Sequence, residues 1–160
     1  MKTQSMTYYG VGPRIMRPTA IYGIIAILLT IFSPKLFLMN FMPSAVFHII
    51  GGIFLGFGIA FLYISSKAMK IAVSKGKLET TGTFALVRNP LYFGWMFFIF
   101  TGIAIVSQAW LIFGMPALAY FRFNKLISQE EDALEEAYGE EYITYKKNVP
   151  LIIPRCKDIF

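Results

Sequence analysis

The chain has 160 residues, of which 56% are hydrophobic and 15% are charged, and its formal net charge is +6. This length allows one domain, and the composition is too apolar for an ordinary soluble domain of this size. The positive charge does not indicate a nucleic-acid-binding protein, because the Lys and Arg residues are confined to a few short segments.

The charged residues are separated by long uncharged stretches. No Asp, Glu, Lys or Arg occurs between Lys35 and Lys67, or between Arg88 and Arg122. Each stretch is longer than the ~20 residues that span a bilayer as a helix. The sequence therefore predicts a polytopic membrane protein.

The first half of the chain contains two predicted spans. An N-terminal polar arm of 17 residues precedes the first, at about 19–32, which Ser33-Pro34-Lys35 interrupts. The second, at about 44–65, contains Gly52-x-x-x-Gly56, a pattern that permits close helix approach. Lysines interleaved with apolar residues then predict an amphipathic extension of this helix into the interface, ending near Gly76.

The second uncharged stretch predicts a helical hairpin. As one straight helix, residues 90–121 would be about 48 Å long, well beyond the ~30 Å hydrocarbon core. We expect spans at about 91–106 and 109–124 with a turn near Ser107-Gln108, and a helix that continues to Tyr138. Gly139 should end or bend this helix, and an extended apolar tail should follow from Val149 to Pro154.

This arrangement predicts the orientation in the membrane. With about four spans, only Lys35 of the fifteen Lys and Arg residues falls on the far side. The positive-inside rule then places both termini in the cytoplasm. The arm shows no cleavable signal peptide. We regard Cys156, the single Cys, as incidental, and we expect no metal site.

Two carboxylates border the apolar stripe of the last long helix. Glu130 and Glu131 fall between Ile127 and Leu134, each within one turn of both. A carboxylate held against an apolar surface needs a partner, because an isolated buried charge is costly. That partner is either a nearby cation, Arg122 or Lys125, or a bound cationic ligand.

A second candidate half-site lies where the basic loop meets the third span. Arg88-Asn89-Pro90 stands at this junction, where Asn can cap a helix and Pro is tolerated at its first position. Taken alone, this tripeptide is more typical of an anchor and a cap than of a binding site.

The ordered combination of these motifs resembles the isoprenylcysteine carboxyl methyltransferase family, and the phospholipid methyltransferases are similar in the same region. The resemblance covers about half of the chain, from Leu78 to Pro154, and includes these motifs in order: Gly82, Arg88-Asn89-Pro90-Leu91-Tyr92, Glu130-Glu131-x-x-Leu134, Gly139-Glu140-Glu141-Tyr142-x-x-Tyr145 and Val149-Pro150.

The resemblance implies an integral membrane methyltransferase that uses S-adenosyl-L-methionine in a cytoplasm-facing pocket. The pocket would be formed by the loop before the third span, that span, and the C-terminal segment. By position, the resemblance assigns the following residues to cofactor binding, with backbone groups of 77–79 framing the adenosine: Lys77, Leu78, Glu79, Phe84, Asn89, Pro90, Tyr92, Glu130 and Glu131.

Three positions depart from the family pattern. Asn89 stands where the family usually has His, so an acid–base role there is in doubt. Phe84 replaces a common Tyr, and Leu126 occupies the position of the substrate-side Arg in the isoprenylcysteine enzymes. Arg88, Arg122 and Lys125 are the candidates for orienting an anionic head group instead.

The sequence thus predicts an all-α membrane helical bundle that forms a single domain over 1–160, with a cytoplasmic C-terminal segment over 125–160. The implied reaction is methyl transfer to a lipophilic acceptor, whose reacting group is a carboxylate, an amine or a thiol. Two other interpretations are a small four-helix transporter and a sterol-reductase-like enzyme of the same fold. The transporter is disfavoured because every Glu lies outside the predicted spans.

Overall fold

The computed structural model describes residues 10–154, which form a bundle of helices; Cys156 lies outside this range. Within it, extended pairing is limited to an isolated β-bridge between Leu38 and Ala109. The elements are α1 (Gly12–Phe32), α2 (Pro34–Phe37), α3 (Ser44–Ser74), α4 (Thr83–Leu86), α5 (Pro90–Phe93), the π-helical turn η1 (Gly94–Ile99), α6 (Phe100–Val106), the 3₁₀ turn η2 (Trp110–Phe113), α7 (Gly114–Tyr138) and α8 (Glu140–Asn148). The all-α prediction is confirmed.

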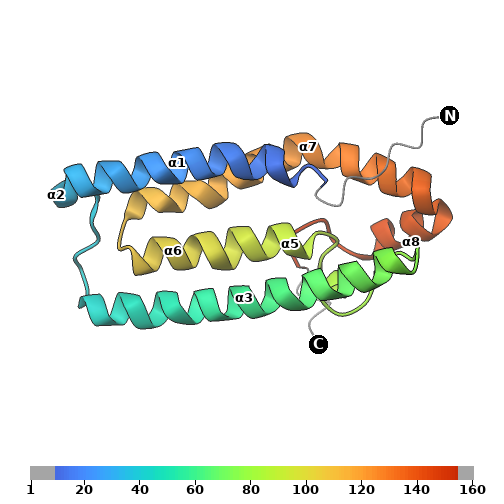
Figure 1. The fold of residues 1–160 in the computed structure, drawn as a ribbon, viewed down its shortest axis with the longest axis horizontal. Helices are drawn as coiled ribbons and strands as arrows, with labels where there is room; N and C mark the ends of the chain where they lie inside the picture. The colour runs from blue at the N-terminus through green and yellow to red at the C-terminus, as the bar shows by residue number, and fades with distance from the viewer. Residues whose placement is uncertain (1–9, 155–160) are drawn as a thin grey trace.

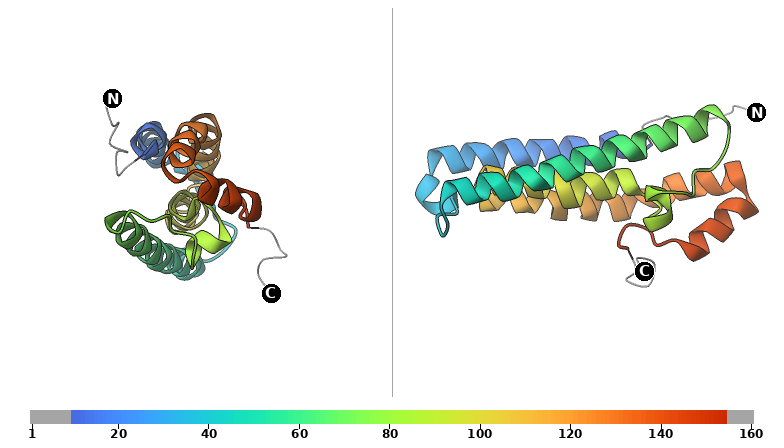
Figure 2. Two further views of the ribbon diagram at one scale, coloured as in Figure 1. Left: turned by 90° about the vertical axis from the view of Figure 1, so that its right-hand side faces the viewer. Right: turned by 90° about the horizontal axis from the view of Figure 1, so that it is seen from below.

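The long helices lie side by side along the longest axis of the molecule (Figure 1). Helix α3 packs along α6 and η1, and α1 packs along α7. At the end of α7 the chain reverses, and α8 turns back toward the bundle (Figure 2). The start of α1, the end of α3, the start of α5 and helix α8 are thereby gathered toward one end of the bundle (Figure 1).

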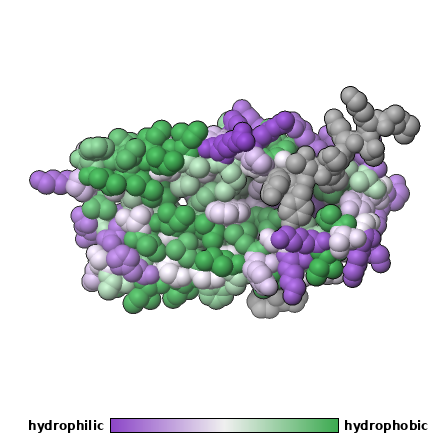
Figure 3. All heavy atoms as spheres, in the orientation of Figure 1, coloured by the Kyte–Doolittle hydropathy of each residue, from purple (hydrophilic) through white to green (hydrophobic). Residues whose placement is uncertain are grey.

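Hydropathy divides the molecule along this axis. Apolar residues cover most of the bundle, and polar residues concentrate at the end that carries α8 (Figure 3). Helices α1 and α3 are long and apolar enough to cross a membrane, and Pro90–Val106 is apolar but shorter. The membrane character and two spans agree with the sequence, whereas a total of four spans remains a prediction.

The first helix begins earlier than the sequence predicts. Helix α1 starts at Gly12, so Arg14 and Arg17 are helical rather than part of a polar arm. It continues through Pro18, which has no N–H to donate to the Arg14 carbonyl. Arg122 of α7 donates to that carbonyl instead, over 3.2 Å. This contact gives the Arg14 carbonyl the donor that Pro18 cannot supply.

The predicted helix ends are close to the observed ones. Helix α3 runs on to Ser74, and Gly76 follows with φ +62°. The hairpin turns at Ser107 and Gln108, where Gln108 has φ +55°. Helix α7 ends at Gly139, also with φ +55°. A left-handed conformation stops a helix in each case.

The glycines that allow close packing are not the predicted pair. A Cβ at Gly51 would lie 2.8 Å from the Val106 nitrogen, and one at Gly58 would lie 2.8 Å from the Phe98 Cβ. Gly52 and Gly56 have no atoms within 4 Å of such a Cβ. Helix α3 therefore packs on α6 and η1 through the neighbouring helix face, which carries Gly51 and Gly58.

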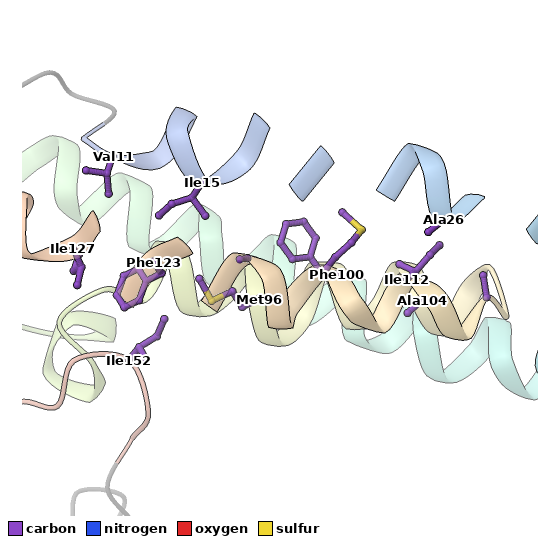
Figure 4. Packing of buried hydrophobic residues seen from close by; sticks show 13 residues of the cluster. Val11, Ile15, Ala26, Met96, Phe100, Ala104, Ile112, Phe123, Ile127 and Ile152 are labelled. Carbon is purple, nitrogen blue, oxygen red and sulfur yellow. The ribbon is translucent and has the colours of Figure 1, made fainter. Parts of the chain in front are cut away.

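The buried core runs between α1, η1–α6 and α7 and ends at the C-terminal tail (Figure 4). Ile15, Phe123 and Ile112 are fully buried in it, and Ile152 contributes from the tail. The extended apolar tail is thus part of the core, which fixes the polar end of the bundle to its apolar part.

Candidate functional site

The loop-to-helix corner at Arg88-Asn89-Pro90 is held by the C-terminal tail. The Arg88 N–H donates to the Pro150 carbonyl over 2.9 Å, and the Asn89 side-chain amide donates to the Leu151 carbonyl over 3.2 Å. Helix α5 begins at Pro90, as expected, but Asn89 makes no side-chain cap. Asn89 thus occupies the N-cap position, but its side chain donates to the tail and does not cap the helix.

Helix α8 fixes the preceding loop in a similar way. The buried Tyr145 hydroxyl donates to the Phe84 carbonyl over 2.6 Å. Tyr142 is also buried, and its ring lies against that of Tyr145. Burial raises the pKa of the Tyr142 hydroxyl to about 12, and the nearby Glu131 charge acts in the same direction. Both phenols are therefore neutral donors at physiological pH.

Glu130 is largely buried and has neutral partners. Its Oε1 accepts hydrogen bonds from the Val11 N–H at 2.5 Å and from the Tyr92 hydroxyl at 2.9 Å. Burial raises the pKa of Glu130, while these two bonds act to lower it. Among residues 10–154, no Lys or Arg forms a salt bridge with this carboxylate.

Glu131 has the opposite environment. It forms salt bridges with Arg88 and, over 3.2 Å, with Lys146 of α8. The side chains of Glu131 and Arg88 are only 13% and 10% exposed, so this pair is well shielded from solvent. One carboxylate of the acidic pair is thus neutralised by cations of the protein, and the other is not.

The nearby cations that the sequence offered as partners lie elsewhere. Arg122 donates to the Arg14 carbonyl, and the Lys125 ammonium lies 4.4 Å from the centre of the Phe121 ring. Neither lines the cavity described next. Glu130 therefore has no cationic partner among residues 10–154.

A cavity of about 560 Å³ lies between these elements, within the ~300–1,000 Å³ range of small-molecule sites. All nine residues that the resemblance assigns to cofactor binding line it: Lys77, Leu78, Glu79, Phe84, Asn89, Pro90, Tyr92, Glu130 and Glu131. Arg88 also lines it. The two distant halves of the predicted site therefore meet around one space.

Other lining residues were not predicted from the sequence. Gly10, Gly12 and Met16 come from the start of α1, and Met69 and Val73 come from α3. Gly10-Val11-Gly12 gave no signal of a binding role, because this sequence is also typical of a turn. Tyr142 and Tyr145 stood within a family motif, so that motif was the available signal for them.

Over the described residues, this arrangement defines an all-helical protein of membrane type with a cavity at the polar end of its bundle. A family model described as phospholipid methyltransferase matches residues 45–141, more than half of the chain. The chain belongs to this family.

Curated relatives include methyltransferases for different acceptors. Protein-S-isoprenylcysteine O-methyltransferase of Homo sapiens is 37% identical over 87 residues, covering 51% of this chain and 29% of the relative. The Xenopus laevis protein of that name is 29% identical over 82 residues, covering 51% and 28%. Methanethiol S-methyltransferase of Crocosphaera subtropica is 36% identical over 78 residues, covering 49% and 29%.

The matched segments span less than a third of the length of these relatives. No solved structure matches the chain.

Proposed function

We propose that this protein transfers a methyl group from S-adenosyl-L-methionine to a lipophilic acceptor at the cytoplasmic face of a membrane. The observation that carries the proposal is that one cavity collects the nine predicted cofactor residues, which come from the segment between α3 and α5 and from α5 and α7. Family membership and the methyltransferase relatives support the reaction type. The proposal includes one domain over 1–160 with four spans and both termini in the cytoplasm.

The donor set of the cavity fits this cofactor. When bound, S-adenosyl-L-methionine would supply a sulfonium methyl group for direct displacement by the acceptor. Glu130, which has no cationic protein partner among the described residues, would bind the methionyl ammonium. The aromatic rings of Phe84 and Tyr92 suit the adenine and the cationic sulfur. Lys77, Leu78 and Glu79 would frame the adenosine.

The remaining wall of the cavity supports an apolar acceptor. Met16, Met69, Val73 and Trp95 line it, and Val73 and Trp95 are 55% and 37% exposed. In a membrane, this exposed apolar wall would face lipid, so an acceptor could reach the cavity from the bilayer. Holding cofactor and acceptor in line would supply most of the acceleration.

Of the cations expected to orient the acceptor, only Arg88 lines the cavity. Its guanidinium is paired with Glu131, which fixes it in place. We therefore retain Arg88 as the orienting candidate and assign no such role to Arg122 or Lys125.

Calorimetry of the detergent-purified full chain with S-adenosylhomocysteine tests the proposal. We expect the wild type to bind S-adenosylhomocysteine with a micromolar Kd, which corresponds to a binding free energy of ~−8 kcal/mol. We expect Glu130→Gln to lose this binding. Glu136→Gln is the matched control, because Glu136 lies on the exposed face of α7. Absence of binding by the wild type would overturn the proposal.

The acceptor can be identified separately. Incubating the purified protein with a membrane lipid extract and cofactor labelled in its methyl group should transfer label into the organic phase. Base-labile label would indicate a methyl ester and therefore a carboxylate acceptor, whereas stable label would indicate an amine or a thiol.

A further inference from the structure

The turn that precedes α1 packs directly on the Glu130 carboxylate. The Val11 N–H donates to Glu130 Oε1 over 2.5 Å, across 119 residues of sequence. Val11 is only 5% exposed, and Ile15, one turn along α1, is fully buried in the core. The turn is therefore anchored, and its contact with Glu130 belongs to the packed structure.

Position 10 of this turn favours glycine. Gly10 has φ +47°, a left-handed conformation that other residues rarely adopt. A Cβ built on Gly10 would lie 1.7 Å from Glu130 Oε1, far inside any non-bonded contact distance. A side chain at position 10 would therefore strain the backbone and push the Glu130 carboxylate out of its place.

A second donor reaches the same carboxylate oxygen from α5. The Tyr92 hydroxyl donates to Glu130 Oε1 over 2.9 Å, so both hydrogen bonds act on one oxygen and neither acts on Oε2. Both donors are neutral, so they fix the carboxylate without cancelling its charge. A carboxylate held in this way by one oxygen can present the other to a cation.

We infer that residues 10–12 and Tyr92 form a positioning element that fixes one oxygen of Glu130 and leaves the other oxygen for the ammonium of the ligand. The inference rests on the proposed function, since it assigns these residues a role in cofactor binding. It adds the start of α1 to a site that the sequence placed entirely after residue 76.

The inference predicts a pH dependence. Burial raises the pKa of Glu130, and the Val11 and Tyr92 hydrogen bonds lower it. The other charged groups nearby are engaged: Arg88 with Glu131, and Arg14 with the Gln129 side chain. Loss of either donor should raise the pKa further. Cation binding needs the ionised form of Glu130. As the pH is lowered, the variant should therefore lose binding at a higher pH than the wild type does.

The experiment compares three variants of the full chain in detergent, with affinity for S-adenosylhomocysteine measured by calorimetry across the acidic range. Gly10→Ala should weaken binding by at least about ten-fold, the effect of one hydrogen bond to a charged group. Tyr92→Phe should move the acidic loss of binding to higher pH. Gly139→Ala is the control, because it has the same type of strained φ but no atom within 4 Å.

The outcomes separate this inference from the proposed function. If the wild type does not bind, the proposed function fails. If the wild type binds but Gly10→Ala matches Gly139→Ala at every pH, the positioning inference is overturned and the proposed function stands. If Gly10→Ala does not fold, Tyr92→Phe decides, and an unchanged pH profile in that variant overturns the inference.

Discussion

The apolar bundle and the polar end of this molecule are stabilised in different ways. In the bundle, α3 approaches α6 at Gly51 and η1 at Gly58, and the neighbouring groups are backbone atoms or apolar side chains. At the polar end, Arg88, Glu130 and Glu131 are shielded from solvent and held by partners far away in the sequence. The difference shows that the stability of the bundle depends on close packing of its helices. The structure around the cavity depends on ion pairs and hydrogen bonds to shielded charged groups.

The largest effect on stability is expected at the polar end. Arg88→Met would leave Glu131 shielded with only Lys146 as a partner, and we expect a loss of about 3 kcal/mol in the free energy of unfolding. Denaturant unfolding in detergent measures it. Lys146→Met is the control, and its side chain is 37% exposed, so the expected loss is below about 1 kcal/mol. Equal small losses would remove the distinction between the two regions.

An intermediate effect is expected in the bundle. Gly51→Ala would bring a Cβ to 2.8 Å from the Val106 nitrogen and 3.0 Å from the Gly102 carbonyl oxygen. These are backbone atoms that cannot rotate away, so we expect a loss of about 1–3 kcal/mol. Gly52→Ala, with open space around it, should be neutral or stabilising by up to about 1 kcal/mol. Thermal unfolding of both variants measures the contrast, and a matching loss in Gly52→Ala would show that α3 packs through a different face.

The smallest effect is expected at Asn89. Asn89→His restores the residue that the resembling family usually carries and keeps a donor for the Leu151 carbonyl. We expect the affinity for S-adenosylhomocysteine to stay within about three-fold of the wild-type value. This change is smaller than the effect of losing one hydrogen bond to a charged group. A marked loss in calorimetry would show that the corner does not accommodate imidazole, and that the position is wrongly matched to the family pattern.

The sequence predicted the bundle better than the site. Hydropathy revealed α1, a long uncharged stretch revealed α3, and glycines and a polar turn marked the ends of α3, α6 and α7. These are local signals, because hydropathy and backbone freedom belong to single residues and their neighbours. The choice between Gly51 and Gly52 was not predictable in this way, since it depends on which face of α3 meets α6.

The site was predicted through resemblance, and its internal arrangement was not. Spacing placed Glu130 and Glu131 together at the edge of an apolar stripe but could not tell which would be paired. Their difference arises from Lys146 and Val11, which belong to elements at opposite ends of the sequence. The π-helical turn over Gly94–Ile99 was also missed. It begins where Gly94 approaches Leu62 of α3, a contact between separate helices.

The tail contacts at Pro150 and Leu151 have a consequence for biosynthesis. The corner at Arg88-Asn89 is held by carbonyl groups that leave the ribosome after helices α1 to α7 have been translated. The nascent chain can therefore insert its apolar helices while the pocket is still open on one side. A stalled chain that lacks residues 142–151 would have neither the Tyr145 hydrogen bond to Phe84 nor the tail carbonyls that hold this corner.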